Sequence, residues 1–486
     1  MTFSSTISNN NDNPAKNKSV IIIGGGIGGL YAGWKLCKNG FDVTILDRQN
    51  FVGGFSASIS YKEYKIDLGP HYATFPSDSP ITKDIFEVIG KENIIEIQDI
   101  HKWYRSFYKG KIINGFPTIY DALFNLGVKS FLPGLLSFLL SRIKPKKNFE
   151  NSENYFKSLY GQYLFINWCK PYLIQTIGTI DVPINYAKKR FKPITFKKVL
   201  HKLTNSKSKN NSTKSNIKKR KYIDCYFRDG IGNIINSLVT EIEKLNGKII
   251  LGADVELIRH DTEEKILKFS KDNLTHELKS DIIIYATPLQ ITKRWFNNLE
   301  QEKNIIKNSN FHSIMVFFGI DSPKIFDGWM LGVFDERVPF FRIAQQTFLT
   351  KTVAPPKKSL LSIEIRSSEN DPLWNENEQT ISKKVENSLN QIGLLKGEKI
   401  DAVKVLKFRN LYPTIPNSND ESENKIEIDS ITKSKNEYFL GIQKMDSGRL
   451  VSDGDSSGES DAVGGIFTSI NEANNLIEKI ISDNSN

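Results

Sequence analysis

The chain has 486 residues, of which 39% are hydrophobic and 25% charged, and this balance excludes a disordered chain or a small disulfide-held scaffold. Its length exceeds what one hydrophobic core usually serves, so we expect at least two folded regions. The net charge of +11 would suit nucleic acid, a membrane surface or an anionic ligand, but much of the excess lies between Lys188 and Lys221 without a nucleic-acid-binding motif. We therefore expect no nucleic-acid partner.

The cysteines and the N-terminus indicate where the protein works. Cys37, Cys169 and Cys225 are far apart and form no CxxC pair, which favours a reducing compartment. Residues 1–18 are rich in Ser and Asn and lack the apolar stretch of a secretory signal, so we predict a disordered leader and a cytoplasmic location. The sequence contains no run of 18 apolar residues, so we expect no membrane-spanning helix. It also contains no ligand spacing typical of a metal site, so we expect no metal.

The first elements form a βαβ pattern. An apolar run at Ser19–Ile23 predicts a strand, Leu30–Asn39 has helical character and is closed by Gly40, and Phe41–Leu46 predicts a second strand. A β-strand, a helix and a parallel strand in this order are typical of a nucleotide-binding unit.

A glycine fingerprint lies at the junction of this first strand and helix. The sequence GGGIGG fits GxGxxG and comprises Gly24, Gly25, Gly26, Ile27, Gly28 and Gly29. Gly24 allows a tight turn, Gly26 lets the backbone approach a pyrophosphate, and Gly29 permits close packing of helix on sheet. The helix N-terminus adds unpaired N–H donors for phosphate.

An acidic residue ends the second predicted strand. Asp47 lies 23 residues after Gly24 and is followed by Arg48, and its carboxylate can accept hydrogen bonds from ribose hydroxyls. The motif therefore predicts a dinucleotide site and leaves FAD and NAD open at this point.

The residues after Asp47 carry a family resemblance. Val52, Gly53, Gly54 and Phe55 make the sequence resemble the FAD-binding superfamily of amine oxidases, protoporphyrinogen oxidase, phytoene desaturases and UDP-galactopyranose mutase. The resemblance implies FAD as cofactor, with Gly53, Gly54, Phe55 and Ser56 against the flavin pyrophosphate and ring. Ser56 departs from the Arg that many members carry at this position.

Further segments resemble the same superfamily. Asp67, Gly69, Pro70, His71 and Tyr72 look like its segment that runs past the isoalloxazine, which implies a catalytic role for His71, with a structural role as the alternative. Outside this segment, the resemblance places the backbone of Val255 at the adenine end and Gly441 in a glycine loop beside the flavin.

The middle of the chain contains an apolar stretch and a basic one. Leu123–Ile143 is largely apolar, is interrupted by Pro133, and precedes Lys144, Lys146 and Lys147. It predicts either a buried helix of a cap domain or an interfacial helix with peripheral membrane contact. Residues 205–220 are rich in Ser, Asn and Lys, which predicts a disordered surface insertion.

The later elements suggest that the cofactor domain resumes after this insertion. We predict helices at 230–245, 378–392 and 465–481, and strands at 248–251, 255–259, 281–285, 312–320, 360–365 and 437–443. The last helix is expected to fold back on the first domain.

These elements predict an α/β protein with a Rossmann-type FAD-binding domain of discontinuous segments and an inserted α+β substrate domain. After the leader, the expected bounds are 19–100, 222–290 and 436–486 for the FAD domain, and 101–221 and 291–435 for the substrate domain.

The resemblance implies an FAD-dependent oxidoreductase that transfers a hydride from an organic substrate to flavin N5. An apolar substrate would meet aromatic side chains of the middle region, such as Phe317 and Phe340, although core packing is the alternative. The competing function is a non-redox, mutase-like enzyme acting on a sugar nucleotide. Its diphosphate would need cations and hydroxyls, for which the candidate substrate-binding residues are Lys170, Tyr172, Arg342 and Tyr412.

Overall fold

The computed structural model describes most of the chain. The described residues are 18–69, 71–115, 128–143, 149, 151–176, 178–184, 187–188, 221–259, 265–292, 295, 311–412, 436–440 and 465–484. The predicted leader, apart from Lys18, and the predicted insertion at 205–220 lie outside the described residues.

A parallel sheet forms the centre of the half of the molecule that contains the predicted nucleotide-binding unit. Its order is β10-β2-β1-β14-β20, and every neighbouring pair is parallel. The strands are β1 (Ser19–Ile23), β2 (Asp42–Asp47), β10 (Lys248–Leu251), β14 (Ile282–Tyr285) and β20 (Glu437–Phe439). β1 and β14 are continuous apolar runs because both of their faces are covered. The predicted Rossmann-type α/β fold is confirmed.

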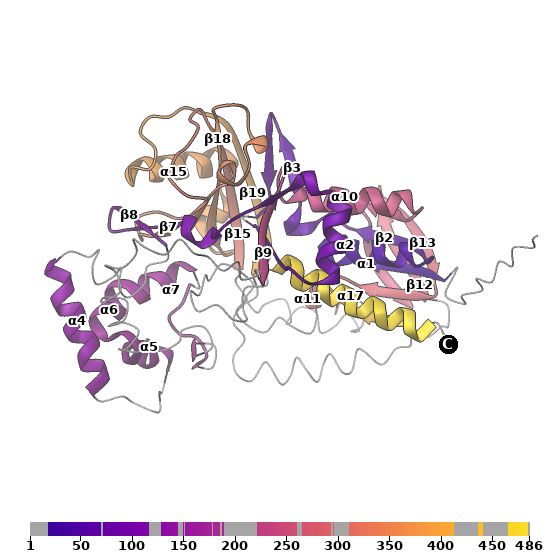
Figure 1. The fold of residues 1–486 in the computed structure, drawn as a ribbon, viewed down its shortest axis with the longest axis horizontal. Helices are drawn as coiled ribbons and strands as arrows, with labels where there is room; N and C mark the ends of the chain where they lie inside the picture. Colours follow the sequence, from indigo (N-terminus) through magenta and orange to yellow (C-terminus); the bar gives the residue numbers. More distant parts are fainter. Residues whose placement is uncertain are drawn as a thin grey trace, which may run out of the picture.

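Helices from distant parts of the sequence cover this region: the first packs on β1 and β2, and the others pack on it or on one another. They are α1 (Ile27–Lys38), α2 (Pro80–Ile89), α10 (Gly232–Lys244) and α17 (Gly465–Asn484). α17 runs beside α1, and the Tyr31 hydroxyl donates a hydrogen bond to Asn474 Oδ1 at 3.2 Å (Figure 1). The C-terminal helix thus folds back on the first βαβ unit, as predicted.

Three small sheets surround this centre. One contains β11 (Asp254–Arg259), β12 (Lys265–Lys271) and β13 (Leu274–Ser280); the second contains β3 (Ser58–Tyr61) and β4 (Tyr64–Asp67); the third has the order β5 (Ala73–Pro76), β9 (Tyr222–Phe227), β6 (Ile94–Glu96). In the third sheet, β9 lies between β5 and β6, so residues before and after the long middle segment share one sheet.

A larger, mostly antiparallel sheet forms the other half (Figure 1). In spatial order it contains β19 (Ile400–Tyr412), β15 (Phe311–Ile320), β18 (Ser359–Ser367), β17 (Arg342–Gln345), β16 (Met330–Phe334), β7 (Tyr104–Tyr108) and β8 (Lys111–Asn114). One face packs its apolar residues against α15 (Glu378–Gln391), and Phe340 belongs to this core. Phe317, on the opposite face, packs with Tyr64 and Ile66 of β4. Both aromatics therefore pack in hydrophobic cores, as the alternative interpretation proposed.

Helices of the middle segment form a separate cluster beyond β7 and β8 (Figure 1). They are α4 (Val128–Ile143), α5 (Ser152–Tyr160), α6 (Gln162–Leu164), the π-helical turn η4 (Phe165–Cys169) and α7 (Lys170–Thr176). Phe138, Phe156 and Phe165 form part of its core. Of the helices that the structure describes, none combines the length and the apolar character needed to cross a membrane.

Short helices complete the connections. They are η1 (Gly54–Ser56), η2 (Lys91–Asn93), η3 (Ile100–Trp103), α11 (Leu289–Thr292), α13 (Gln346–Leu349), η6 (Lys351–Val353) and α14 (Pro372–Asn375).

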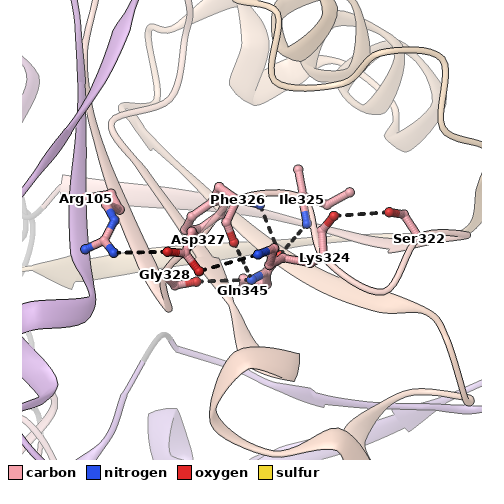
Figure 2. A network of polar contacts seen from close by, with 8 residues as sticks. All are labelled: Arg105, Ser322, Lys324, Ile325, Phe326, Asp327, Gly328 and Gln345. Carbon is pink, nitrogen blue, oxygen red and sulfur yellow. Dashed lines mark hydrogen bonds and ion pairs between the residues drawn. The ribbon is translucent and has the colours of Figure 1, made fainter.

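A buried glutamine fixes the loop between β15 and β16, as Figure 2 shows. Gln345 Oε1 accepts from the backbone N–H of Ile325 at 2.7 Å, and its Nε2 donates to the carbonyls of Phe326 and Gly328 at 3.0 and 3.1 Å. Asp327 in the same loop lies 3.6 Å from the guanidinium of Arg105 on β7. These contacts join β7, β16 and β17 at one end of the large sheet.

Candidate functional site

The glycine fingerprint forms a tight turn between β1 and α1. Gly24 has a φ of +113°, which L side chains rarely adopt, and its N–H donates to Leu46 O at 2.8 Å. The chain then enters α1 at Ile27, with Gly26 as N-cap. Gly53 lies beside this turn, where it forms a parallel bridge with Gly26 and donates its N–H to Gly25 O at 2.7 Å. The two glycine segments that the sequence singled out are therefore adjacent.

The surroundings of Gly26 and Gly29 differ in a way that fits a bound pyrophosphate. A Cβ added to Gly29 would lie 2.0 Å from Gly24 O, so Gly29 is required by packing. A Cβ added to Gly26 would meet no described atom within 4 Å. The backbone at Gly26 thus faces open space at the N-terminus of α1, where the first N–H groups of a helix have no intrahelical acceptor and favour anions.

Asp47 holds the fingerprint turn from the end of β2. Its carboxylate accepts from the N–H of Gly25 at 2.7 Å and from the N–H of Gln49 at 2.8 Å. Arg48, the next residue, is exposed. Asp47 is only partly buried, and its contact with a ribose stays a prediction.

The Gly-Gly segment turns back along the large sheet. Gly53 and Gly54 both have positive φ, and Ser56 is buried after the turn. Phe55 remains partly exposed and packs edge-to-face against Phe408 of β19, with ring centroids 5.1 Å apart. This segment therefore contacts both the fingerprint turn, through Gly53, and the large sheet, through Phe55.

His71 lies just before β5. Its ring packs on Gly69, because a Cβ added there would lie 2.1 Å from His71 Cε1. The Nδ1 atom is buried and has no hydrogen-bond partner among the described residues. Burial, helped by the positive charge of Arg342, lowers the pKa of His71 to about 4. The imidazole is therefore neutral at pH 7 and offers an unsatisfied nitrogen that fits a polar group of a bound molecule.

Arg342 on β17 belongs to a buried ion pair. It lies directly opposite Glu364 of β18, and its Nε donates to Glu364 Oε2 at 2.8 Å while its Nη2 contacts the same oxygen. Glu364 is 1% exposed. The guanidinium is therefore held by a carboxylate, which compensates its charge beside His71.

Asp67 connects the two halves of the molecule. Its buried carboxylate accepts from the Ser58 hydroxyl, the Tyr226 hydroxyl and the Ile231 N–H. The Tyr226 hydroxyl in turn accepts from Gln346 Nε2 at 3.4 Å, in the helix that follows β17. Burial raises the pKa of Asp67 to about 6, although these donors oppose the shift.

We expect the raised pKa of Asp67 to make stability depend on pH. Between pH 4 and 6 the folded state retains a proton that the unfolded state has lost, so this contribution is complete below the unfolded pKa of 3.8 and is lost as the pH rises through 6. The free energy of unfolding of the parent relative to Asp67→Asn should fall by about 2–2.5 kcal/mol between pH 4 and 7. Urea titrations across this range measure it. Asp272→Asn, at an exposed turn, is the control, and equal pH profiles for Asp67→Asn and the parent would contradict the assignment.

The remaining predicted site residues lie on other elements or outside the described residues. Val255 on β11 is 9% exposed, and its carbonyl accepts from Trp295 Nε1 at 3.0 Å. Lys170 is exposed at the start of α7. Outside the described residues lie Pro70 and Gly441 and the side chains of Tyr172 and Tyr412.

Sequence reasoning missed polar residues on the large sheet. Glu364 and Ser362 point to the face opposite the core around α15, and Ser362 donates to Gln346 Oε1 at 2.9 Å. Ser313 on β15 has a buried hydroxyl with no hydrogen-bond partner among the described residues. A signal was present, because polar residues alternate with isoleucines in the β18 sequence SIEIRS, as expected of a strand with one polar face.

Comparison with known proteins agrees with this geometry. Residues 22–88 match the NAD(P)-binding Rossmann-like domain family. The chain is 34% identical over 100 residues to the 4,4'-diaponeurosporene oxygenase of Staphylococcus haemolyticus, which covers 20% of this chain and 19% of the relative. It is 31% identical over 94 residues to the carotenoid 3,4-desaturase of Haloarcula japonica, covering 19% of this chain and 18% of the relative. The chain thus matches about a fifth of the length of these relatives.

The fold similarity extends over most of the chain. The structure of reduced UDP-galactopyranose mutase superposes with a TM-score of 0.70 and covers 87% of this chain and 89% of the mutase, at 15% sequence identity. At this identity the similarity shows a shared fold alone. The predicted resemblance is confirmed as a Rossmann-like NAD(P)-binding sequence at residues 22–88, as local similarity to the oxygenase and the desaturase, and as a fold shared with the mutase.

Proposed function

We propose that this chain is an FAD-dependent oxidoreductase that removes a hydride from an apolar organic substrate. The observation that carries the proposal is the open backbone at Gly26, which lies at a helix N-terminus beside Gly53. The names of the relatives, an oxygenase and a desaturase, support the same class of reaction.

Each segment of the site has a distinct role in holding the cofactor. Gly24 to Gly29 would hold the pyrophosphate, Asp47 the ribose, and the backbone of Val255 the adenine end. The segments Gly53 to Ser56 and Gly69 to His71, with Gly441, would contact the flavin. Once bound, FAD would supply the redox chemistry by accepting a hydride at N5.

The chain's own residues would orient the cofactor and the substrate and would surround them with groups that carry no net charge. His71 remains uncharged at neutral pH, so its free nitrogen can form one hydrogen bond without adding a cation. Arg342 is compensated by Glu364, which makes it a weak candidate for binding the diphosphate of a sugar nucleotide. The buried pair therefore favours an apolar substrate over the mutase alternative.

The neutral His71, the compensated Arg342 and the names of the relatives together support one substrate class. We propose an extended polyene hydrocarbon of the carotenoid type, because both curated relatives are named for reactions on such compounds. Anaerobic mixing with an acyclic carotenoid precursor should bleach the flavin absorbance, and air should restore it. Turnover of UDP-galactopyranose only after reduction, with no net consumption of electrons, would instead establish the mutase alternative.

We expect His71→Ala to retain FAD but to slow flavin reduction by the substrate roughly tenfold or more, because one buried hydrogen bond is lost. Stopped-flow absorbance measures the rate. His276→Ala, on the exposed strand β13, serves as the matched control. Because the pKa of His71 is about 4, the parent rate should show no step from this residue between pH 6 and 8. A fully active His71→Ala enzyme would remove His71 from the reaction.

A further inference from the structure

Helix α4 presents an apolar stripe to solvent. Leu132, Leu136, Leu139 and Leu140 are 64%, 59%, 37% and 57% exposed. Their spacing of four, three and one residues places them on one side of a helix, in a stripe about 100° wide. Leucines this exposed and this close together are uncommon on a monomer surface without a partner.

The opposite side of α4 is fixed to the protein. Phe138 is buried in the core of the helical cluster, the Ser137 hydroxyl accepts from Tyr163 N–H at 2.9 Å, and Arg142 donates to Leu159 O at 2.9 Å. A Cβ added to Gly161 would lie 2.3 Å from Ser137 O, so the backbones are in close contact. The helix therefore cannot rotate to bury its leucines.

The sequence in and next to α4 carries charges of one sign. Between Ala122 and Phe149 the sequence contains Lys129, Arg142, Lys144, Lys146 and Lys147, and it contains no Asp or Glu. A helix with an exposed apolar stripe in a basic stretch of sequence matches a surface that is apolar inside and negatively charged outside.

We propose that α4 is a docking surface for an anionic lipid bilayer, with its four leucines in the boundary between headgroups and acyl chains. α4 lies in the helical cluster, away from α1 and α17 (Figure 1), so docking would leave the fingerprint turn accessible. A second copy of the chain is the competing occupant, but a segment whose sequence has five cations and no carboxylate would repel the same segment of a symmetric partner. The proposal does not depend on the proposed chemistry.

Vesicle sedimentation of the full-length protein tests the proposal. Vesicles of phosphatidylcholine with phosphatidylglycerol should bind the parent, and those of phosphatidylcholine alone should bind it at least roughly tenfold more weakly. The double variant Leu136→Gln, Leu140→Gln should bind the anionic vesicles roughly tenfold to a hundredfold more weakly than the parent, because two leucines no longer insert. Both side chains are exposed, so folding should be unaffected.

Leu257→Gln with Leu274→Gln is the matched control, because these leucines are 45% and 64% exposed on β11 and β13. This control should bind like the parent. Equal binding of parent and α4 variant, or equal binding to neutral and anionic vesicles, would overturn the proposal. Self-association that the α4 variant abolishes, without vesicle binding by the parent, would overturn it in favour of a second copy.

Discussion

Gly26→Val should yield a folded protein that no longer retains FAD. Gly26 has an ordinary extended conformation, with φ of −69° and ψ of 174°, and a Cβ there meets no described atom within 4 Å. The valine side chain should therefore cost little stability, but it would occupy the space through which a pyrophosphate approaches the backbone. The measurement is the flavin absorbance per mole of purified protein, together with the urea midpoint.

Two further variants make this result specific. Gly26→Ala, with a smaller side chain, should retain more flavin than Gly26→Val. Gly29→Ala should instead destabilise the fold, because its Cβ would lie 2.0 Å from Gly24 O. A folded Gly26→Val protein with a full complement of FAD would contradict the assignment of the fingerprint.

Arg342→Gln should lower the free energy of unfolding by about 3–5 kcal/mol, because it leaves the buried carboxylate of Glu364 without its guanidinium partner. The double variant Arg342→Gln, Glu364→Gln should recover most of this loss, since the buried negative charge is then also removed. Urea unfolding of both variants and the parent measures the difference.

The control for this prediction is an ion pair at the surface. Arg337 is 56% exposed and pairs with Asp335 in the loop after β16. Arg337→Gln should cost at most about 1 kcal/mol, because water screens that pair. If Arg342→Gln costs no more than Arg337→Gln, Arg342 is not held as the structure indicates and regains its candidacy for binding a diphosphate.

The nucleotide-binding half was largely predictable because its signals are local. β1 and β10 have the predicted bounds, since each is a short apolar run with polar or glycine residues at its ends. Helix α1 begins at Ile27 rather than at the predicted Leu30. Glycines disfavour a helix by propensity, but here Gly28 lies beside Ser469 of α17 and Gly29 packs against Gly24 O, so tertiary contacts hold them in the first turn.

The candidate site was only partly predictable because its contacts join residues far apart in the chain. The fingerprint and the Gly-Gly pair follow from spacing, and the structure brings Gly26 and Gly53 together. The hydrogen bond from Tyr226 to Asp67 joins residues 159 positions apart, so no periodic pattern in the sequence could have predicted it. The sequence marked Arg342 as a cation available to substrate, whereas its partner Glu364 is set by strand register in the folded sheet.

The most direct test of the central claim is the visible absorption spectrum of the purified full-length protein, followed by identification of any flavin released on denaturation. We expect oxidised flavin bands, release of FAD, and close to one FAD per chain after reconstitution. A colourless protein that takes up no FAD on reconstitution would contradict it.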